Sequence, residues 1–489
     1  MSAPKTWDLV VIGGGSAGLI AATTAAGLGA SVLLVERHRL GGDCLWTGCV
    51  PSKALIAAAR RERAHDAAGR AADRPAAHDA ADPASGAVSR DARFAAAMTA
   101  VRAAIAAIEP HDAAPTLERS GVAVRMGEAR FTSARSLDVG GQEVRFRRAI
   151  VATGASPAPL RIDGADDVRI RTSDDLWELE RLPERLVIVG GGPVGCELGQ
   201  AMARLGAQVT IVHRGERLLP KEDAVASGIV ADALRADGVD LRLGRAATAV
   251  RSHDGTAGEL VLDDGEAVPF DVLLAAVGRA SRPAALALEA AGVRTDAAGS
   301  IVVDASLRTS APGIWAAGEV AGLPRYTHTA GVSGSVAATN AVLGLRRAFD
   351  AARTPRVTFT APEVASIGVQ PEGVDPRRHR VLEQLHADTD RAIADGETSG
   401  STRIVVDRRG RILGGTIVGP RAGETMGELA LAVQAGLTTG DLTAATHPYP
   451  TYSDALWNAA IDDVRHRLGR GAPAAAIRML RGLAARRGR

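Results

Sequence analysis

The length and composition of the chain are those of a large globular protein with several domains. It has 489 residues, of which 46% are hydrophobic and 23% are charged, and its formal net charge is +2. This length suits two to four domains, and the ordinary composition excludes a wholly disordered or fibrous chain. The small net charge gives no overall signal for binding to nucleic acid or to a membrane surface. The chain has no apolar run of the roughly 18 residues that a membrane span needs, and its first residues lack the apolar core of a secretion signal, so we expect a cytoplasmic protein.

The first segment has the pattern of a nucleotide-binding unit. An apolar strand over Trp7–Ile12 precedes a glycine-rich turn, an alanine-rich helix ends near Gly29, and a second strand covers residues 31–35. In such a turn the glycines allow the sharp bend, the approach of a pyrophosphate and the packing of the helix on the strand. An acid at the end of the second strand binds a ribose with a free 2′-hydroxyl. These roles fall to Gly13, Gly15, Gly18 and Glu36, which favours FAD or NAD over a glycine-rich turn without a ligand.

The same pattern recurs about 177 residues later, which predicts a second nucleotide-binding domain. A strand over Arg185–Val189 leads into a second glycine turn, a helix over Cys196–Leu205 follows, and a second strand covers Gln208–Val212. The turn glycines are Gly190, Gly192 and Gly195.

The second unit has no carboxylate where the first has Glu36. Its second strand ends in His213-Arg214, and Arg217 and Lys221 follow. A guanidinium can bind a 2′-phosphate with two parallel hydrogen bonds, whereas a carboxylate would repel it. We therefore predict that Arg214 favours NADPH, with NADH also possible. The alternative is that these cations are surface charges and that the preference is weak.

A pair of cysteines marks the redox chemistry. Cys44 and Cys49 stand five positions apart, and Lys53 follows one helical turn later. Two such thiols form a disulfide if a turn or helix start brings their Cα atoms within about 7 Å. In a protein that is not stabilised by several disulfides, such a pair is more typical of a catalytic role than of a structural one. No second Cys or His pair has the spacing of zinc ligands, so we expect no metal site. We expect no redox role for Cys196, which follows the second glycine turn.

The remaining segments are less specific. Residues 60–93 are rich in Ala, Asp, Arg, His and Pro, which predicts a helix end followed by a low-complexity surface loop. From about Arg356, strand patterns over 357–359, 402–406 and 412–418 and a helix over Thr425–Ala435 predict an α+β domain. The last 25 residues carry eight arginines and no acid. They form either a basic amphipathic helix that contacts a partner or a solvated helical tail.

These motifs, with Ala152-Thr153-Gly154, Gly278-Arg279 and the segment 309–319, occur in the order found in one family. The chain resembles the class I pyridine nucleotide-disulfide oxidoreductases, which include dihydrolipoamide dehydrogenase, glutathione reductase and mercuric reductase. The resemblance implies an α/β fold with two Rossmann-like dinucleotide-binding domains and a C-terminal α+β dimerisation domain. The expected domains are an FAD domain (1–155 and 283–350), an NAD(P)H domain (156–282) and a dimerisation domain with a basic tail (351–489).

The resemblance also implies roles for single residues. Cys49 is the thiol on the flavin side, Cys44 is the interchange thiol, and Lys53 pairs with Glu197. A helix beginning near His328 points its positive end at the flavin. The further cofactor contacts fall on Gly42, Lys53, Thr153, Gly154, Gly278, Gly318 and Glu319. Glu319 stands where the family usually has an aspartate.

The C-terminal motif distinguishes between members of the family. Where lipoamide dehydrogenase and glutathione reductase have a catalytic His before Pro-Thr, this chain has Tyr449, with Asp454 five residues later and His447 two residues earlier. A phenol with a pKa near 10 is a poor base at pH 7. Three features resemble the mercuric-reductase-like branch: a tyrosine at this position, the sequence Gly-Gly-Asp-Cys that ends at Cys44, and the segment 108–112. The chain nevertheless has no C-terminal cysteine pair.

The sequence therefore predicts an FAD-dependent NAD(P)H oxidoreductase. Its Cys44–Cys49 disulfide passes electrons to a disulfide, a soft metal ion or a quinone. We expect a homodimer whose active sites are shared, with Tyr449 facing the partner's cysteines. The alternatives are a dihydrolipoamide dehydrogenase in which His447 serves as the base, and a nucleotide-binding sensor with little turnover.

Overall fold

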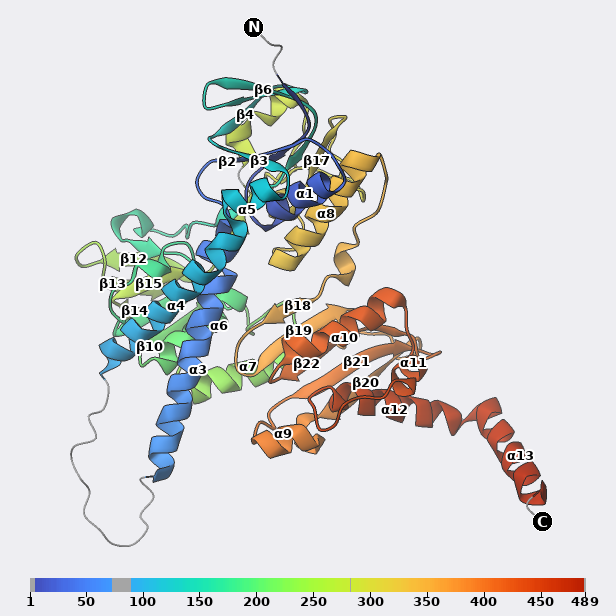
Figure 1. Ribbon diagram of the computed structural model, residues 1–489. Helices are drawn as coiled ribbons and strands as arrows, with labels where there is room; N and C mark the ends of the chain where they lie inside the picture. The colour runs from blue at the N-terminus through green and yellow to red at the C-terminus, as the bar shows by residue number, and fades with distance from the viewer. Residues whose placement is uncertain (1–4, 73–88, 282, 488–489) are drawn as a thin grey trace, which may run out of the picture. The chain divides into compact units, whose positions relative to one another are not determined.

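The computed structural model describes residues 5–72, 89–281 and 283–487. Its contacts divide the chain into two compact units. The first unit contains the residues up to Glu216 together with Asp237–Ala351, and the second contains Arg217–Ala236 and Ala352–Arg489. Figure 1 shows both units and labels many of their elements.

The first unit contains a seven-stranded sheet built around β1 (Thr6–Ile12), which lies between two parallel neighbours, β2 (Val32–Glu36) and β6 (Gln142–Val151). Its order is β3-β2-β1-β6-β5-β4, with β17 also paired to β6. The other strands are β3 (Val122–Met126), β4 (Ala129–Ser133), β5 (Ser136–Val139) and β17 (Ile314–Ala316). The parallel strands place their carboxyl ends, and the turns that follow them, at one edge.

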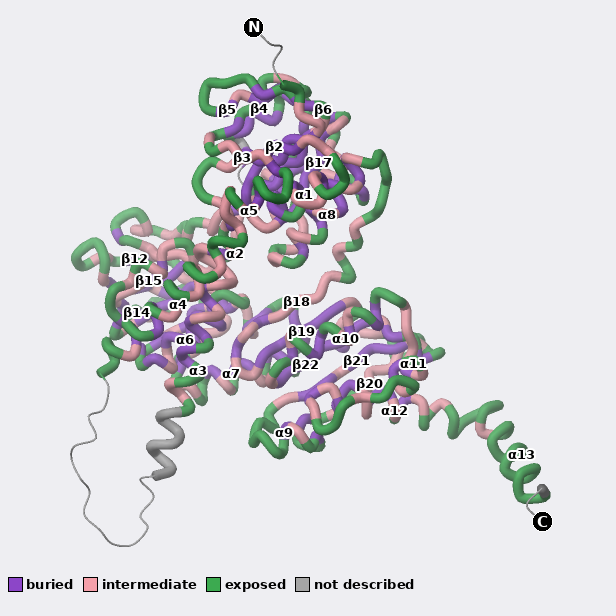
Figure 2. The backbone as a smooth tube through the Cα atoms, in the orientation of Figure 1, coloured by how far each residue is buried: buried purple, intermediate pink, exposed green. Residues whose placement is uncertain are grey.

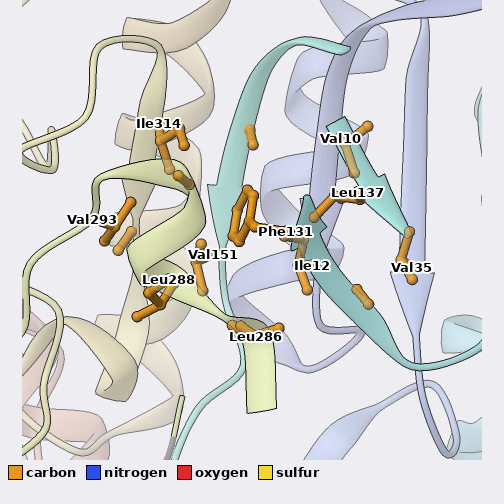
Figure 3. Packing of buried hydrophobic residues seen from close by; sticks show 14 of the residues in the cluster. Val10, Ile12, Val35, Phe131, Leu137, Val151, Leu286, Leu288, Val293 and Ile314 are labelled. Carbon is orange, nitrogen blue, oxygen red and sulfur yellow. The ribbon is translucent and has the colours of Figure 1, made fainter. Parts of the chain in front are cut away.

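Both faces of this sheet are buried, because alternate side chains of β1 enter two different apolar clusters. Val10 and Ile12 pack with Phe131 and Leu286 (Figure 3). The neighbouring residues of β1 pack on the other face against helices α1 (Ser16–Gly27) and α8 (Thr327–Leu343). A continuous apolar run with no polar face is typical of a parallel strand covered on both sides.

A second parallel sheet, with the order β11-β10-β9-β15-β8, repeats the strand–turn–helix arrangement. Its elements are β8 (Ile170–Arg171), β9 (Arg185–Val189), α6 (Pro193–Arg204), β10 (Gln208–His213), β11 (Asp240–Leu243) and β15 (Val272–Ala275). An antiparallel sheet of β12 (Ala247–Ser252), β13 (Gly258–Leu262) and β14 (Ala267–Phe270) and a pair of β7 (Ser156–Pro157) and β16 (Arg279–Ala280) complete the strands of this unit. In the first sheet, β4–β5 and β5–β6 pair in antiparallel orientation, and its other strand pairs are parallel. The parallel strands of the two sheets confirm the predicted fold class.

Several helices follow the first βαβ unit. They are α2 (Gly42–Trp46), α3 (Cys49–Ala72), α4 (Arg90–Asp112) and α5 (Ala114–Arg119). Helix α3 continues to Ala72, well beyond the start of the predicted loop, because alanine and arginine are strong helix formers. Residues 73–88 of the predicted stretch lie outside the described residues, and its end is helical rather than a loop, because α4 begins at Arg90. Short 3₁₀ helices occur at Ala165–Asp167, Leu176–Glu178, Pro283–Leu286, Leu288–Ala291, Gly318–Ala321, Ala351–Arg353 and His386–Asp388.

The second unit is an antiparallel sheet with helices packed against it, as predicted. The sheet has the order β18-β19-β22-β21-β20, and helices α10 and α12 contact its strands. The bounds are β18 (Arg356–Thr358), β19 (Glu363–Gly368), β20 (His379–Leu385), β21 (Ser401–Asp407), β22 (Ile412–Gly419), α7 (Ala224–Ala236), α9 (Asp390–Asp395), α10 (Ala422–Ala435), α11 (Thr439–Ala444), α12 (Asp454–Leu468) and α13 (Gly471–Arg487). Among the described helices, none is long and apolar enough to cross a membrane.

Candidate active site

A cavity of ≈ 990 Å³ in the first unit connects the first glycine turn with the cysteine segment. Its volume is at the upper end of the range for small-molecule and cofactor sites. Nine of the predicted site residues line it: Gly13, Gly15, Glu36, Gly42, Cys44, Thr153, Gly154, Gly318 and Glu319. The turns that directly follow β1, β2 and β6 along the chain therefore line the same cavity.

The backbone segments of the glycine turn approach each other too closely to carry side chains. A Cβ atom on Gly18 would lie 1.8 Å from the carbonyl oxygen of Gly13, and one on Gly42 would lie 2.6 Å from the Cα of Gly15. Helix α1 has no side-chain cap, and its first residue, Ser16, lines the cavity. Uncapped N–H groups and the helix dipole attract a phosphate. The cavity therefore fits the pyrophosphate of a dinucleotide such as FAD.

Glu36 is hydrogen-bonded to this turn and lines the cavity. Its Oε2 accepts a hydrogen bond from the Gly14 N–H at 2.6 Å, and its Oε1 accepts one from the His38 N–H at 2.8 Å. These bonds hold the carboxylate at the wall of the cavity. A carboxylate fixed there suits the two hydroxyls of an adenosine ribose.

The two thiols lie on consecutive helices and contact each other. Cys44 lies within α2, Cys49 is the first residue of α3, and both are free thiols in hydrogen-bond contact. The hydrogen bond from Cys44 lowers the pKa of Cys49, helped by Thr327, whose Oγ1 lies 3.1 Å from the Cys49 Sγ, and by the charge of Lys53. The same contact, with burial, raises the pKa of Cys44. The arrangement thus favours a thiolate on Cys49 and a protonated thiol on Cys44.

Lys53 and Glu197 form the ion pair that the resemblance implies. The Lys53 Nζ lies 2.8 Å from the Glu197 Oε2, and the glutamate side chain is only 7% exposed. Lys53 lies one turn after Cys49 on α3, and α3 packs against α6, which carries Glu197. Helix packing therefore brings together charges that lie 144 residues apart in the chain.

Arg279 joins the cysteine segment to Glu319, a contact that the sequence did not predict. Its Nε lies 3.1 Å from the Glu319 Oε2, and its Nη2 contacts the Asp43 carboxylate and the Ala155 carbonyl oxygen. Burial raises the pKa of Glu319, although the charge of Arg279 opposes this. The longer Glu319 side chain is thus held by a guanidinium at the cavity wall. Gly278, which precedes Arg279, adopts a φ of +118°.

The second glycine turn repeats the geometry of the first. A Cβ atom on Gly195 would lie 2.0 Å from the carbonyl oxygen of Gly190, and α6 begins directly after Gly192 without a side-chain cap. Beyond β10, Arg214 is exposed, whereas Arg217 forms an ion pair with Glu372 at 3.0 Å. Arg214 is the more exposed of these two arginines.

The C-terminal motif lies in the second unit. The Tyr449 hydroxyl donates a hydrogen bond to the Asp390 Oδ2 at 2.5 Å, and this bond raises the pKa of the phenol. Tyr449 as a whole is 73% exposed. Asp454 is buried at the start of α12 and accepts a hydrogen bond from the Thr451 N–H. Tyr449, which stands where the resemblance implies a histidine in other members of the family, is thus an exposed phenol that keeps its proton at neutral pH.

His447 is held away from that position by its own contacts. Its Nε2 lies 2.7 Å from the Glu428 Oε1, and its ring stacks on Trp457. Burial lowers the pKa of His447, but the hydrogen bonds to Glu428 and to the Ala445 carbonyl outweigh burial and raise it. Within the described part of the chain, no group of three or more His, Cys, Asp or Glu side chains could hold a metal ion.

Two family models match the chain. The family model described as "Pyridine nucleotide-disulphide oxidoreductase" matches residues 7–334, and that of the family's dimerisation domain matches residues 354–460.

Individual relatives cover nearly the whole chain. A mercuric reductase of Streptomyces lividans is 34% identical over 470 residues, covering 94% of this chain and 97% of its own length. A dihydrolipoyl dehydrogenase of Thermus scotoductus is 35% identical over 470 residues, with 93% and 97% coverage. The Cu(II) complex of the HOCl-induced flavoprotein disulfide reductase RclA from Escherichia coli has a TM-score of 0.80 and 26% identity, and covers 93% of this chain and 99% of its own.

Proposed function

Because the chain belongs to the pyridine nucleotide-disulphide oxidoreductases, we propose that it reduces a soft metal ion through Cys44 and Cys49 with electrons from NADPH. The family is one of FAD-dependent enzymes, and the cavity between Glu36 and Cys44 fits this cofactor. The chemistry that bound FAD would supply is transfer of an electron pair from the nicotinamide to the disulfide. The S–S bond breaks, and each sulfur gains one electron of the pair.

The residues of the chain then hold the products of that step. Cys49 keeps its charge as a thiolate, stabilised by the Cys44 hydrogen bond, Thr327 and Lys53. Cys44 takes up a proton and is the thiol that meets the acceptor. A thiophilic dication displaces that proton and binds both sulfurs. Return of two electrons from the sulfurs to the metal closes the disulfide and releases the reduced metal.

The observation that carries the choice of acceptor is the hydrogen bond between Tyr449 and Asp390. A disulfide acceptor produces a thiolate leaving group and needs a group that takes and returns a proton near neutral pH. The Tyr449 phenol has its pKa raised further by Asp390, so it donates but does not accept a proton. Reduction of a metal ion bound to sulfur needs no such base. A quinone that takes electrons without passing through the thiols is the second candidate, because it too dispenses with the base.

We further propose a cytoplasmic homodimer with the three domains expected from the sequence: FAD (1–155 and 283–350), NADPH (156–282) and dimerisation (351–489). A reducing compartment keeps the dithiol available for turnover. In this arrangement Tyr449 belongs to the second unit and serves the cysteines of the partner chain. The exposed ring of Tyr449 supports this role, since it is available to another molecule.

Anaerobic oxidation of NADPH by the purified protein tests the proposal with three acceptors: Hg(II) in excess thiol, lipoamide and a quinone. We expect turnover with Hg(II), loss of that turnover in Cys44→Ser and Cys49→Ser, and little turnover with lipoamide. Rapid lipoamide turnover would contradict the proposal and favour a dihydrolipoamide dehydrogenase. Quinone turnover that survives both cysteine substitutions, without Hg(II) turnover, would assign the enzyme to the quinone alternative.

A further inference from the structure

The last helix of the chain presents an apolar face and a cationic face without packing either into the fold. Helix α13 spans Gly471–Arg487, and all of its residues from 471 to 486 are exposed except Ala474, which is half-buried. Figure 2 shows it green along almost its whole length. Met479 is 63% exposed, Leu480 is 60% exposed and Leu483 is 48% exposed. Side chains of this kind are normally buried, and large apolar groups left in water mark interaction sites.

The apolar residues share one side of the helix. Ala476, Leu480 and Leu483 follow the i, i+4, i+7 spacing that places side chains in one row. Ile477 and Met479 flank this row. Arg478 and Arg481 lie on the opposite side, because each successive residue turns the helix by about 100°. The last residue of the helix, Arg487, stands four positions after Leu483 and ends the apolar row with a cation. We call the row with its flanking residues, Ala476, Ile477, Met479, Leu480 and Leu483, the apolar face of α13.

The charge around this helix has one sign. From Arg470 to the end of the chain there are six arginines and no acidic residue, whereas the whole protein has a net charge of only +2. Arg465 and Arg467 precede this segment on α12 and form ion pairs with Asp462 and Asp463. The cations are therefore concentrated at this end of the chain, where they attract an anionic surface. A helix with an apolar face and an arginine-rich opposite face lies in the plane of a lipid interface, its apolar side chains among the acyl chains and its cations at the headgroups.

We propose that α13 binds the surface of an anionic lipid bilayer and so holds the enzyme at a membrane. Its 17 residues would extend about 25 Å along the interface. A nucleic acid would pair with the arginines but leave the apolar face in water. A second copy of the helix would bring two clusters of like charge together, and the family's matched dimerisation domain ends at residue 460, before α13 begins. An anionic bilayer satisfies both faces at once.

Sedimentation with lipid vesicles tests this proposal on the full-length, FAD-loaded protein. We expect at least tenfold stronger binding to vesicles containing phosphatidylglycerol than to vesicles of phosphatidylcholine alone, and weaker binding as salt is added, because salt screens the arginine contacts. Equal binding to the two kinds of vesicle, or none to phosphatidylglycerol, would overturn the proposal.

Two double variants test the contributions of the apolar face and of the arginines to binding, and a third variant controls for the introduction of glutamine. Leu480→Gln with Leu483→Gln, and Arg478→Gln with Arg481→Gln, should each weaken binding to phosphatidylglycerol vesicles at least tenfold. Ala485→Gln places the same amide on the side opposite the apolar face and should leave binding unchanged. Flavin absorbance and NADPH oxidation verify that each variant is folded.

A measurement without lipid distinguishes a membrane from a protein partner. Sedimentation velocity should give the same oligomeric state for the unmodified protein and for the Leu480→Gln, Leu483→Gln variant. A smaller assembly in the variant would assign the apolar face to a second copy of the chain and overturn the lipid proposal. Unimpaired vesicle binding by that variant would overturn it as well.

Discussion

The ion pair between Lys53 and Glu197 allows the charge at the dithiol to be changed in two opposite directions. The Lys53 charge lowers the pKa of Cys49, and the Glu197 charge raises it. Lys53→Gln should therefore raise the pKa of Cys49, and Glu197→Gln should lower it. Replacing both should return the pKa towards that of the unmodified protein.

The two substitutions should also differ in stability. Lys53→Gln removes the cation that lies 2.8 Å from a carboxylate only 7% exposed, and breaking a buried pair costs about 3–5 kcal/mol. Because the Lys53 side chain is 37% exposed, water screens part of this effect, and we expect a loss of about 2 kcal/mol. Glu197→Gln leaves the lysine with access to water and should cost less, about 1 kcal/mol. Urea unfolding of the FAD-loaded variants measures the difference.

The rate of alkylation by iodoacetamide, followed against pH, measures the thiolate on Cys49. In the reduced, unmodified protein Cys49 should react at a lower pH than Cys44, because its pKa is lowered and that of Cys44 is raised. The curve for Cys49 should move to higher pH in Lys53→Gln and to lower pH in Glu197→Gln. Movement of both curves in the same direction would refute the argument, since a nonspecific loosening of the site has one sign and the two charges have opposite signs.

Three further substitutions test the other contacts of the site. Tyr449→His should raise lipoamide turnover on the order of 100-fold, the contribution of a general base, whereas Tyr449→Phe should not; steady-state kinetics with lipoamide decides between them. Arg214→Glu should weaken NADPH binding at least tenfold and leave NADH binding less affected, which a ratio of KM values would reveal; an equal effect on both would show that Arg214 is only a surface charge. Arg279→Gln should lower FAD affinity at least tenfold, because Asp43 and Glu319 lose the cation that they share, and Arg279→Lys should restore part of it in a flavin-release assay.

Local sequence patterns were enough to predict the parts of the site that depend on neighbouring residues. Gly13 and Gly18 mark the turn because the helix can begin only if the backbone at these positions carries no Cβ atom. The strand Arg185–Val189 has the same bounds in the structure as in the prediction, since its short apolar run is enclosed by turn residues. These features are determined over a few residues, which is the range that periodicity and spacing describe.

Contacts between distant segments were not predictable in the same way. Asp43 and Arg279 are 236 residues apart, and Tyr449 and Asp390 are 59 residues apart. Only the packing of several elements brings such side chains together. The pairing of Arg217 with Glu372 shows the same limit: the sequence offered two arginines and a lysine for a phosphate, and the structure engages one of the arginines elsewhere. Spacing identified the kind of residue, and tertiary packing determines its partner.

The asymmetry of the dithiol connects these observations with the choice of acceptor. A disulfide acceptor must be attacked by the thiolate of Cys44, and the raised pKa of that thiol makes the thiolate scarce at neutral pH unless a base removes the proton. The Tyr449 phenol, itself held protonated by Asp390, does not provide this base. A soft metal ion competes with the proton for the sulfur directly, and the adjacent Cys49 thiolate supplies a second ligand. We therefore expect this pair of thiols to serve a thiophilic cation better than a disulfide acceptor, and replacing Tyr449 with histidine should improve turnover of the disulfide much more than that of the metal ion.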